Sequence, residues 1–397
     1  MIVLSPEEED EIAAQLAGPK WFQAVTEILS HDGPMKLIPA HDWRHQWVQD
    51  TLHRLESVIP ILQREHELNT RWLDVGPDEP PLPPPAEYPL RPRPRGTDRM
   101  RTLSDTLYGR KSTPSAHVIA GPPYSLLVAD RPDAVNAFSY GFGPDGACGI
   151  VVYSGFLDDI LSKAPVQHSS QRSTVAHHFQ KSSLSYLFDS LLRIPQTSPT
   201  TPSHPTPTEE QTTELAILLA HEVAHLVLSH HIETVSSGTI IIPTMMSLVA
   251  DVARTLVFPV TMFFGPFFND GIAQVGKIGS GRLTELGESC TSMKQEIEAD
   301  IVSARLLAYA GFDARKAVAF WNSRGDTPKC SSTKCDSAPP PSSTWHMMGA
   351  SHPIRDVRIE KLKSELARWE LEKRVAVRQR AEGTPTKRSP DTTWALL

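Results

Sequence analysis

Apolar side chains recur at three- and four-residue steps along residues 208–235, which read TEEQTTELAILLAHEVAHLVLSHHIETV. The positions that form this stripe are Leu215, Leu218, Leu219, Val223, Leu226 and Val227. The spacing predicts one long helix whose apolar face lies against a core. Thr206 as N-cap, Pro207 in the first turn and Glu209 three residues after the cap mark its expected start.

Two other regions have the same period. The first opens near Lys294, and its apolar positions are Ile301, Ala304, Leu307 and Ala308. This helix should end at Gly311, because glycine adopts the left-handed conformation that often follows a helix. The second region covers residues 10–70, where the amphipathic positions are Trp43, Trp47, Leu52, Leu55 and Ile59. We expect this N-terminal helical region to pack beside the domain that holds the long helix.

The long helix contains the pattern HExxH, as His221-Glu222-Val-Ala-His225. Residues four apart lie on the same face of a helix, so the two imidazoles can bind one Zn²⁺. Glu222 projects about 100° further round, near enough to act as a base on water at the metal. A surface helix that carries two histidines by chance is the alternative. The apolar stripe around the motif favours a buried metal helix.

Zinc needs a third protein ligand, and the second helix offers one. Glu296 and Asp300 are four residues apart and share a face, whereas Glu298 points about 160° away from Glu296. Glu296 is therefore a candidate ligand, and Asp300 could accept the outward N–H of a ligating histidine. Acidic pairs on helices are otherwise usually solvated. Further along, His352-Pro353 and then Arg358 form a third element, which has little meaning from its own residues.

These three elements, in this order, resemble the HtpX and CAAX-prenyl-protease family of membrane-associated gluzincins. Within it the chain is most similar to the Oma type, a mitochondrial inner-membrane metalloendopeptidase whose activity overlaps with that of the m-AAA protease. Asn136-Ala-Phe138 with residues 149–157 resembles the strand pair of that family. Residues 309–321 resemble its helical hairpin after the glutamate ligand.

The resemblance implies an α+β, mostly helical zincin domain, with a small β-sheet beside the HExxH helix. It implies one Zn²⁺ per chain, held by His221, His225 and Glu296, with Glu222 as general base and then acid. Asp300 and Arg358 would support the ligands, and His352 would lie near the transition-state oxyanion. The expected substrates are polypeptides, above all membrane proteins, and the expected location is the mitochondrial inner membrane.

A substrate would lie extended along an edge strand in residues 134–153, with Asn136 and Phe138 as candidate contacts. Ordinary sheet packing is the alternative for these residues. His230 and His231 follow His221 by nine and ten residues. On one continuous helix they lie about 180° and 280° round from it, so we expect both to face away from the metal.

Four regions are predicted: an N-terminal helical region (1–75), a linker rich in proline and arginine (76–114), a zinc metallopeptidase domain (115–366), and a C-terminal helix end and tail (367–397). The domain carries insertions at 163–207 and 323–344, and an apolar stretch at 239–268. That stretch contains three prolines, Asp251 and Arg254. It is either a kinked hairpin in the core or over the cleft, or a re-entrant or interfacial membrane segment.

Composition narrows the choice of function. With 35 prolines in 397 residues, the chain has long loops, and its net charge of −7 provides no basic field for nucleic acid. The four cysteines form no secreted disulfide framework, and Cys330 with Cys335 forms either a local disulfide or an idle pair of thiols. The N-terminus is acidic and shows no presequence, so a mitochondrial location requires a truncated N-terminus or an internal signal.

Two other functions stay open. The first is a catalytically silent zincin-fold scaffold that binds partners through its proline-rich loops, and the second is a soluble zinc peptidase. Intact ligands and Glu222 argue against the scaffold. The Glu296–Asp300 spacing and the His-Pro element argue against the soluble enzyme. Whichever function holds, the chain could also form a homo-oligomer.

Overall fold

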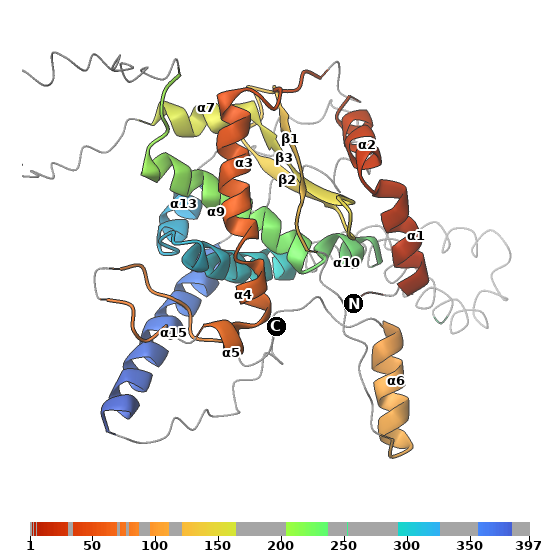
Figure 1. Ribbon diagram of the computed structural model, residues 1–397. Coiled ribbons are helices and arrows are strands. Elements are labelled where there is room, and N and C mark those ends of the chain that lie inside the picture. Colours follow the sequence, from red (N-terminus) through yellow and green to blue (C-terminus); the bar gives the residue numbers. More distant parts are fainter. Residues whose placement is uncertain are drawn as a thin grey trace, which may run out of the picture.

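Helices dominate the chain, and a small mixed sheet lies among them (Figure 1). The computed structural model describes residues 2, 4, 6–30, 35–69, 72–76, 79–86, 96–110, 121–163, 204–236, 252, 293–325 and 356–382. The helices are α1 (Pro6–Leu16), α2 (Pro19–Ser30), α3 (Trp43–Glu56), α4 (Ile59–Gln63), α5 (Glu65–Leu68), α6 (Gly96–Leu107), α7 (Ser154–Ser162), α9 (Glu209–Val227), α10 (His230–Ser236), α13 (Lys316–Gly325) and α15 (Asp356–Ala381), and another helix spans residues 293–309. The strands are β1 (Ser125–Ala129), β2 (Ala137–Gly141) and β3 (Cys148–Tyr153). This architecture agrees with the predicted mostly helical α+β class.

The sheet has the order β1-β3-β2, with β3 parallel to β1 and antiparallel to β2. All six residues of β3 are buried, because both faces of the strand are covered. Ile150 and Val152 join the core that contains α9, whereas Val151 and Tyr153 pack with Trp21 of α2. The predicted strand pair therefore corresponds to β2 and β3, and β1 is a third strand that the sequence did not indicate.

The long helix predicted around the HExxH motif begins two residues later than expected. Thr208 is the N-cap, and its hydroxyl accepts a hydrogen bond from the Gln211 N–H at 3.1 Å. The Gln211 side chain in turn accepts from the Thr208 N–H at 2.9 Å, which completes a capping box. From Leu215 to Val227 every residue of α9 is buried, so the motif lies on a helix surrounded by protein.

The prediction of one continuous helix through residue 235 is wrong. The last turn of α9 ends at Leu228, and Ser229 takes a positive φ of 54°. The next helix, α10, starts at His230 and is bent by 56° from α9. Serine is uncommon in this left-handed conformation, so sequence periodicity gave no sign of the corner.

The helix over residues 293–309 ends as predicted. Gly311 has a φ of +79°, the Gly311 N–H bonds the Ala308 carbonyl at 3.1 Å, and the Phe312 N–H bonds the Leu307 carbonyl at 2.9 Å. A left-handed glycine after a helix produces this arrangement. The chain then turns into α13, which packs against α9.

The predicted packing of the N-terminal helices is confirmed for α3. This helix crosses α9 in Figure 1, with Val48, Leu52 and Leu55 buried in the shared core. The Trp47 indole donates to the Thr212 hydroxyl at 3.1 Å, which adds a polar contact between the same two helices.

Part of the predicted linker packs against helices on either side of it in the sequence. Pro83 and Pro84 are buried, and their carbonyls accept hydrogen bonds from Asn69 and Arg305. The same predicted linker also contains the helix α6. In Figure 1 this helix lies apart from the other labelled helices. At the other end of the peptidase region, α15 runs without a break through the boundary placed at residue 366.

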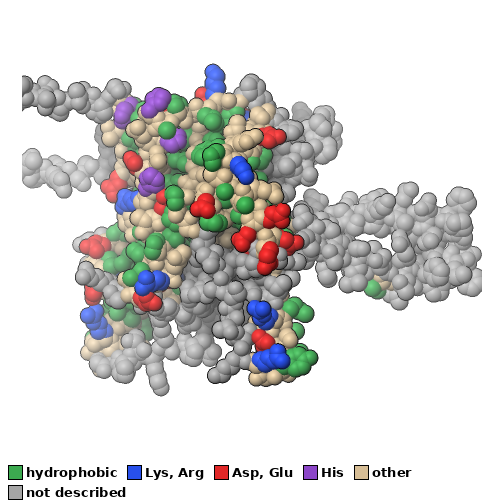
Figure 2. All heavy atoms as spheres, turned by 45° about the vertical axis from the view of Figure 1, so that its right-hand side comes forward, with side chains coloured by type: hydrophobic (Ala, Val, Ile, Leu, Met, Phe, Trp, Pro, Cys, Tyr) green, Lys and Arg blue, Asp and Glu red, His purple; other side chains and the backbone are tan. Residues whose placement is uncertain are grey.

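Within the described part of the chain, no single helix is long and apolar enough to cross a membrane. The bent pair of α9 and α10 passes the same test of length and composition when taken together. The apolar stretch 239–268 lies outside the described residues except for Val252, and so do Cys290, Cys330 and Cys335 and most of both insertions. Figure 2 shows acidic, basic and hydrophobic side chains interspersed over the described part of one face.

Candidate metal centre

Two histidines of α9 and one glutamate of the helix over residues 293–309 converge at a buried point. His221 Nε2 lies 3.2 Å from His225 Nε2 and 3.2 Å from Glu296 Oε2, and His225 Nε2 lies 3.5 Å from Glu296 Oε1. These three residues offer ligand atoms that all lie within 4.8 Å of one another. The structure thus brings together the three residues that the sequence predicted as metal ligands.

The opposite sides of both imidazole rings are held by other side chains. His221 Nδ1 lies 3.1 Å from Asp300 Oδ1, and His225 Nδ1 lies 2.9 Å from His230 Nδ1. Both rings therefore present Nε2 to the common point. Two imidazole nitrogens and one carboxylate, backed in this way, form a donor set that suits Zn²⁺.

Arg358, near the start of α15, joins the two carboxylates of the other helix. Its Nε and Nη2 each lie 2.8 Å from an oxygen of Asp300, and its Nη1 lies 2.9 Å from Glu296 Oε2. The side chain is buried, so these contacts are shielded from water. Arg358 thereby fixes the orientation of the candidate ligand Glu296. It also fixes Asp300, which in turn contacts the candidate ligand His221.

The charge states follow from these contacts. Burial acts to raise the pKa of Asp300, but hydrogen bonds from Arg358 and His221 hold that pKa below its usual value. Burial acts to lower the pKa of Arg358, and its hydrogen bonds with Asp300 raise it instead. Asp300 is therefore a carboxylate and Arg358 a guanidinium cation.

Glu222, which lies between the two histidines in the sequence, is hydrogen-bonded to the sheet. Its Oε2 accepts a hydrogen bond from the Ser139 hydroxyl of β2 at 2.8 Å. His231 Nε2 lies 3.2 Å from the same hydroxyl oxygen. Ser139 of β2 therefore contacts both the Glu222 carboxylate and His231 of α10.

Comparison with known protein families matches residues 111–366 to peptidase family M48. The chain belongs to peptidase family M48. No curated protein and no solved structure matches it. Membership implies an enzyme that hydrolyses peptide bonds, in a family that is zinc-dependent in general. The matched region contains every residue of the cluster described above. Helices α3, α4 and α5 pack against the matched region but precede it in the sequence.

Four residues beside the metal-ligand cluster were not expected there. His230 and His231 were predicted to face away from the metal, which is wrong because the corner at Ser229 turns both toward the site. Ser139 gave no signal in the sequence, since its partner Glu222 is 83 residues away. Trp321 of α13 is the fourth. Its ring centroid lies 5.1 Å from the ring centroid of His221 and 5.1 Å from the guanidinium carbon of Arg358.

Two other predicted site residues, Phe138 and Asn136, belong to the sheet and the segment that leads into it. Phe138 packs on the α2 face of the sheet, with its ring centroid 6.0 Å from that of Tyr153, so its side chain points away from α9. The Asn136 carbonyl accepts a hydrogen bond from the Tyr153 N–H at 3.2 Å. His352 lies outside the described residues.

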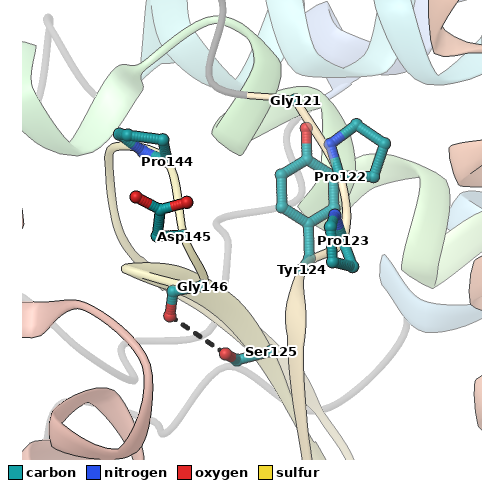
Figure 3. A pocket seen from close by; sticks show the side chains of 8 residues that line it. All are labelled: Gly121, Pro122, Pro123, Tyr124, Ser125, Pro144, Asp145 and Gly146. Atoms are coloured by element: carbon teal, nitrogen blue, oxygen red, sulfur yellow. Dashed lines mark hydrogen bonds between the residues drawn. The ribbon is translucent and has the colours of Figure 1, made fainter.

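The described residues also enclose a cavity of about 500 Å³ (Figure 3). Its walls are the segment before β1, with Pro122, Pro123 and Tyr124, and the turn between β2 and β3, with Asp145. The Ser125 hydroxyl donates to the Gly146 carbonyl at 3.0 Å and closes one end. Its lining includes neither candidate ligands nor Glu222, so we assign it no part in peptide hydrolysis.

Proposed function

We propose that the protein is a zinc-dependent metalloendopeptidase of the zincin type. The observation that supports this most strongly is the convergence of His221 Nε2, His225 Nε2 and the Glu296 carboxylate, with both Nδ1 atoms held from behind. A bound zinc ion supplies Lewis-acid chemistry, in that it acidifies water and polarises the scissile carbonyl. A site with three protein ligands leaves a position open for that chemistry.

Glu222 is the general base in this proposal. It follows His221 directly on α9, and its carboxylate accepts the proton of the attacking water and then delivers it to the leaving amine nitrogen. The Ser139 hydroxyl orients this carboxylate through its 2.8 Å hydrogen bond. His352 stays a prediction as a further donor to the oxyanion.

The substrate would add to β2 as an extended strand. Among the described strands, β2 is an outer member of the sheet, and it packs against α9, which carries the candidate catalytic residues. Backbone hydrogen bonds to such an edge hold a peptide independently of its sequence. Because Phe138 points to the other face, any role of this residue would use its main chain rather than its ring.

The proposed substrates are membrane-associated proteins at the mitochondrial inner membrane, in protein quality control. Support for this location comes from the resemblance of the sequence motifs to the Oma type. Carbonate extraction of mitochondria tests it. Retention of the protein in the membrane pellet is expected, and absence from mitochondria, or full release by carbonate, would contradict the proposal.

Replacement of the base tests the chemistry. Glu222→Gln keeps the shape of the side chain and should retain the metal but lose cleavage of a fluorescein-labelled casein. Glu214→Gln is the matched control, because Glu214 lies on the same helix but forms a partly exposed ion pair with Lys163. Cleavage that survives Glu222→Gln would show that the assigned base is wrong. A zinc-loaded wild-type protein that cleaves nothing would favour the scaffold.

A further inference from the structure

The corner between α9 and α10 places a second histidine directly behind a candidate zinc ligand. On a straight helix His230 would lie about 140° round from His225 and could not reach its ring. The positive φ of Ser229 redirects the chain, so that His230 Nδ1 comes to 2.9 Å from His225 Nδ1. His230 is buried, with 3% of its surface exposed, and its other nitrogen, Nε2, lies 3.5 Å from Glu298 Oε2.

The α10 segment is also tied to the helix that bears Glu296. The Gln295 amide approaches the His230 carbonyl at 3.4 Å, and the Thr234 hydroxyl lies 3.2 Å from the Gln295 side-chain oxygen. The place of His230 is therefore determined from two sides, by its own helix and by the helix of the third ligand. A histidine that merely capped a helix end would need neither the burial nor the contact with His225.

Donor and acceptor chemistry then fixes both tautomers. A metal on His225 Nε2 leaves the ring proton on Nδ1, so Nδ1 must donate to His230 Nδ1. His230 Nδ1 must accept, which requires His230 to be neutral and to carry its proton on Nε2. That proton points toward Glu298, whose carboxylate can accept it. Along this series of contacts, His225 donates to His230, and His230 donates to Glu298.

We propose that His230 is a positioning residue for the ligand His225, and that Glu298 holds His230 in the accepting tautomer. This inference rests on the proposed zinc site. The two histidine ligands would then be supported differently, since His221 bonds a carboxylate paired with Arg358 and His225 bonds a neutral imidazole. Partners of this kind orient the ligand ring and raise its basicity.

The test compares zinc affinity among variants, by competition with a chromophoric chelator. His230→Ala should weaken zinc binding roughly 10- to 100-fold. His230→Asn should recover most of this loss, because the Asn Oδ1 stands near the place of Nδ1 and accepts the same hydrogen bond. His230→Gln should behave like His230→Ala, since its amide reaches toward the Nε2 position. His231→Ala is the matched control, as the neighbouring histidine contacts Ser139, and its zinc affinity should stay within about twofold of wild type.

A spectroscopic measurement separates positioning from general damage to the fold. With Co²⁺ in place of zinc, the visible absorption bands should shift in His230→Ala and return toward the wild-type pattern in His230→Asn. If His230→Ala does not fold, the Asn and Gln variants still decide, because both keep a polar side chain and differ in where it accepts. Equal zinc affinity in those two variants would overturn the inference. If the wild-type protein binds no zinc, the proposed function itself fails instead.

Discussion

Glu65 anchors the N-terminal helices to the helix that carries the candidate metal ligand Glu296. Its two carboxylate oxygens each lie 3.0 Å from Arg305 Nη1. They also accept hydrogen bonds from the Tyr309 hydroxyl at 2.9 Å and the Ala86 N–H at 2.6 Å. The Glu65 and Arg305 side chains are 2% and 3% exposed, so the ion pair is shielded from water.

Glu65→Ala should lower the free energy of unfolding by about 3 kcal/mol. Removal of one partner from a buried ion pair typically costs about 3–5 kcal/mol, because the other charge stays buried without its counterpart. The lower end applies here, since Arg305 keeps the Pro84 carbonyl at 3.0 Å and Glu365 at 3.5 Å. Glu65→Gln retains one acceptor oxygen and should cost about 1–2 kcal/mol.

Urea unfolding at 25 °C, followed by tryptophan fluorescence, measures these differences. Glu67→Ala is the matched control, because Glu67 lies on the same short helix in an exposed ion pair with Arg64, which should contribute less than about 1 kcal/mol. The double replacement Glu65→Leu with Arg305→Met should recover much of the loss, since neither charge is then stranded. If Glu65→Ala costs no more than Glu67→Ala, the anchoring role is refuted.

Three other predictions concern the site and the C-terminal helix. Arg358→Met should weaken zinc binding roughly 10- to 100-fold in the chelator assay, because Glu296 and Asp300 lose a shared donor; unchanged affinity would contradict that role. Ser139→Ala should reduce kcat roughly 10- to 150-fold at unchanged zinc content, since a hydrogen bond to a charged group contributes about 1.5–3 kcal/mol; an unchanged kcat would show that the hydroxyl does not orient Glu222. Burial acts to raise the pKa of Glu365, but Arg368 and Arg305 hold it below the ordinary 4.5, so its stabilising contribution is present above that pH and lost as pH falls further. Glu365→Gln should flatten this part of the pH dependence of urea unfolding, and an unaltered profile would contradict the assignment.

The metal-ligand cluster could be predicted because its geometry is local. His221 with His225, and Glu296 with Asp300, are each four residues apart, so helical periodicity alone places each pair on one face. That the two faces meet was implied by the resemblance of the ordered motifs to the HtpX and CAAX-prenyl-protease family. The left-handed glycine at Gly311 was predictable for the same reason, since a single residue type indicates the end of a helix.

The contacts that support the cluster could not be predicted in this way. The corner at Ser229 depends on a positive φ in a residue that seldom adopts one, so His230 and His231 were placed on the wrong faces. Glu65 and Arg305 are 240 residues apart, and no period in the sequence relates them. Partners of this kind are decided by tertiary packing, and they become visible only when the helices are placed in space.

The zinc content of the purified protein tests the central claim most directly. Metal analysis after dialysis should find about one zinc per chain in the wild-type protein, and much less in His221→Ala or Glu296→Ala. Glu214→Ala is the control and should keep its zinc, because Glu214 lies in a partly exposed ion pair with Lys163 and has no part in the proposed zinc site. The account would be contradicted by a wild-type protein without zinc, or by full zinc content in His221→Ala or Glu296→Ala.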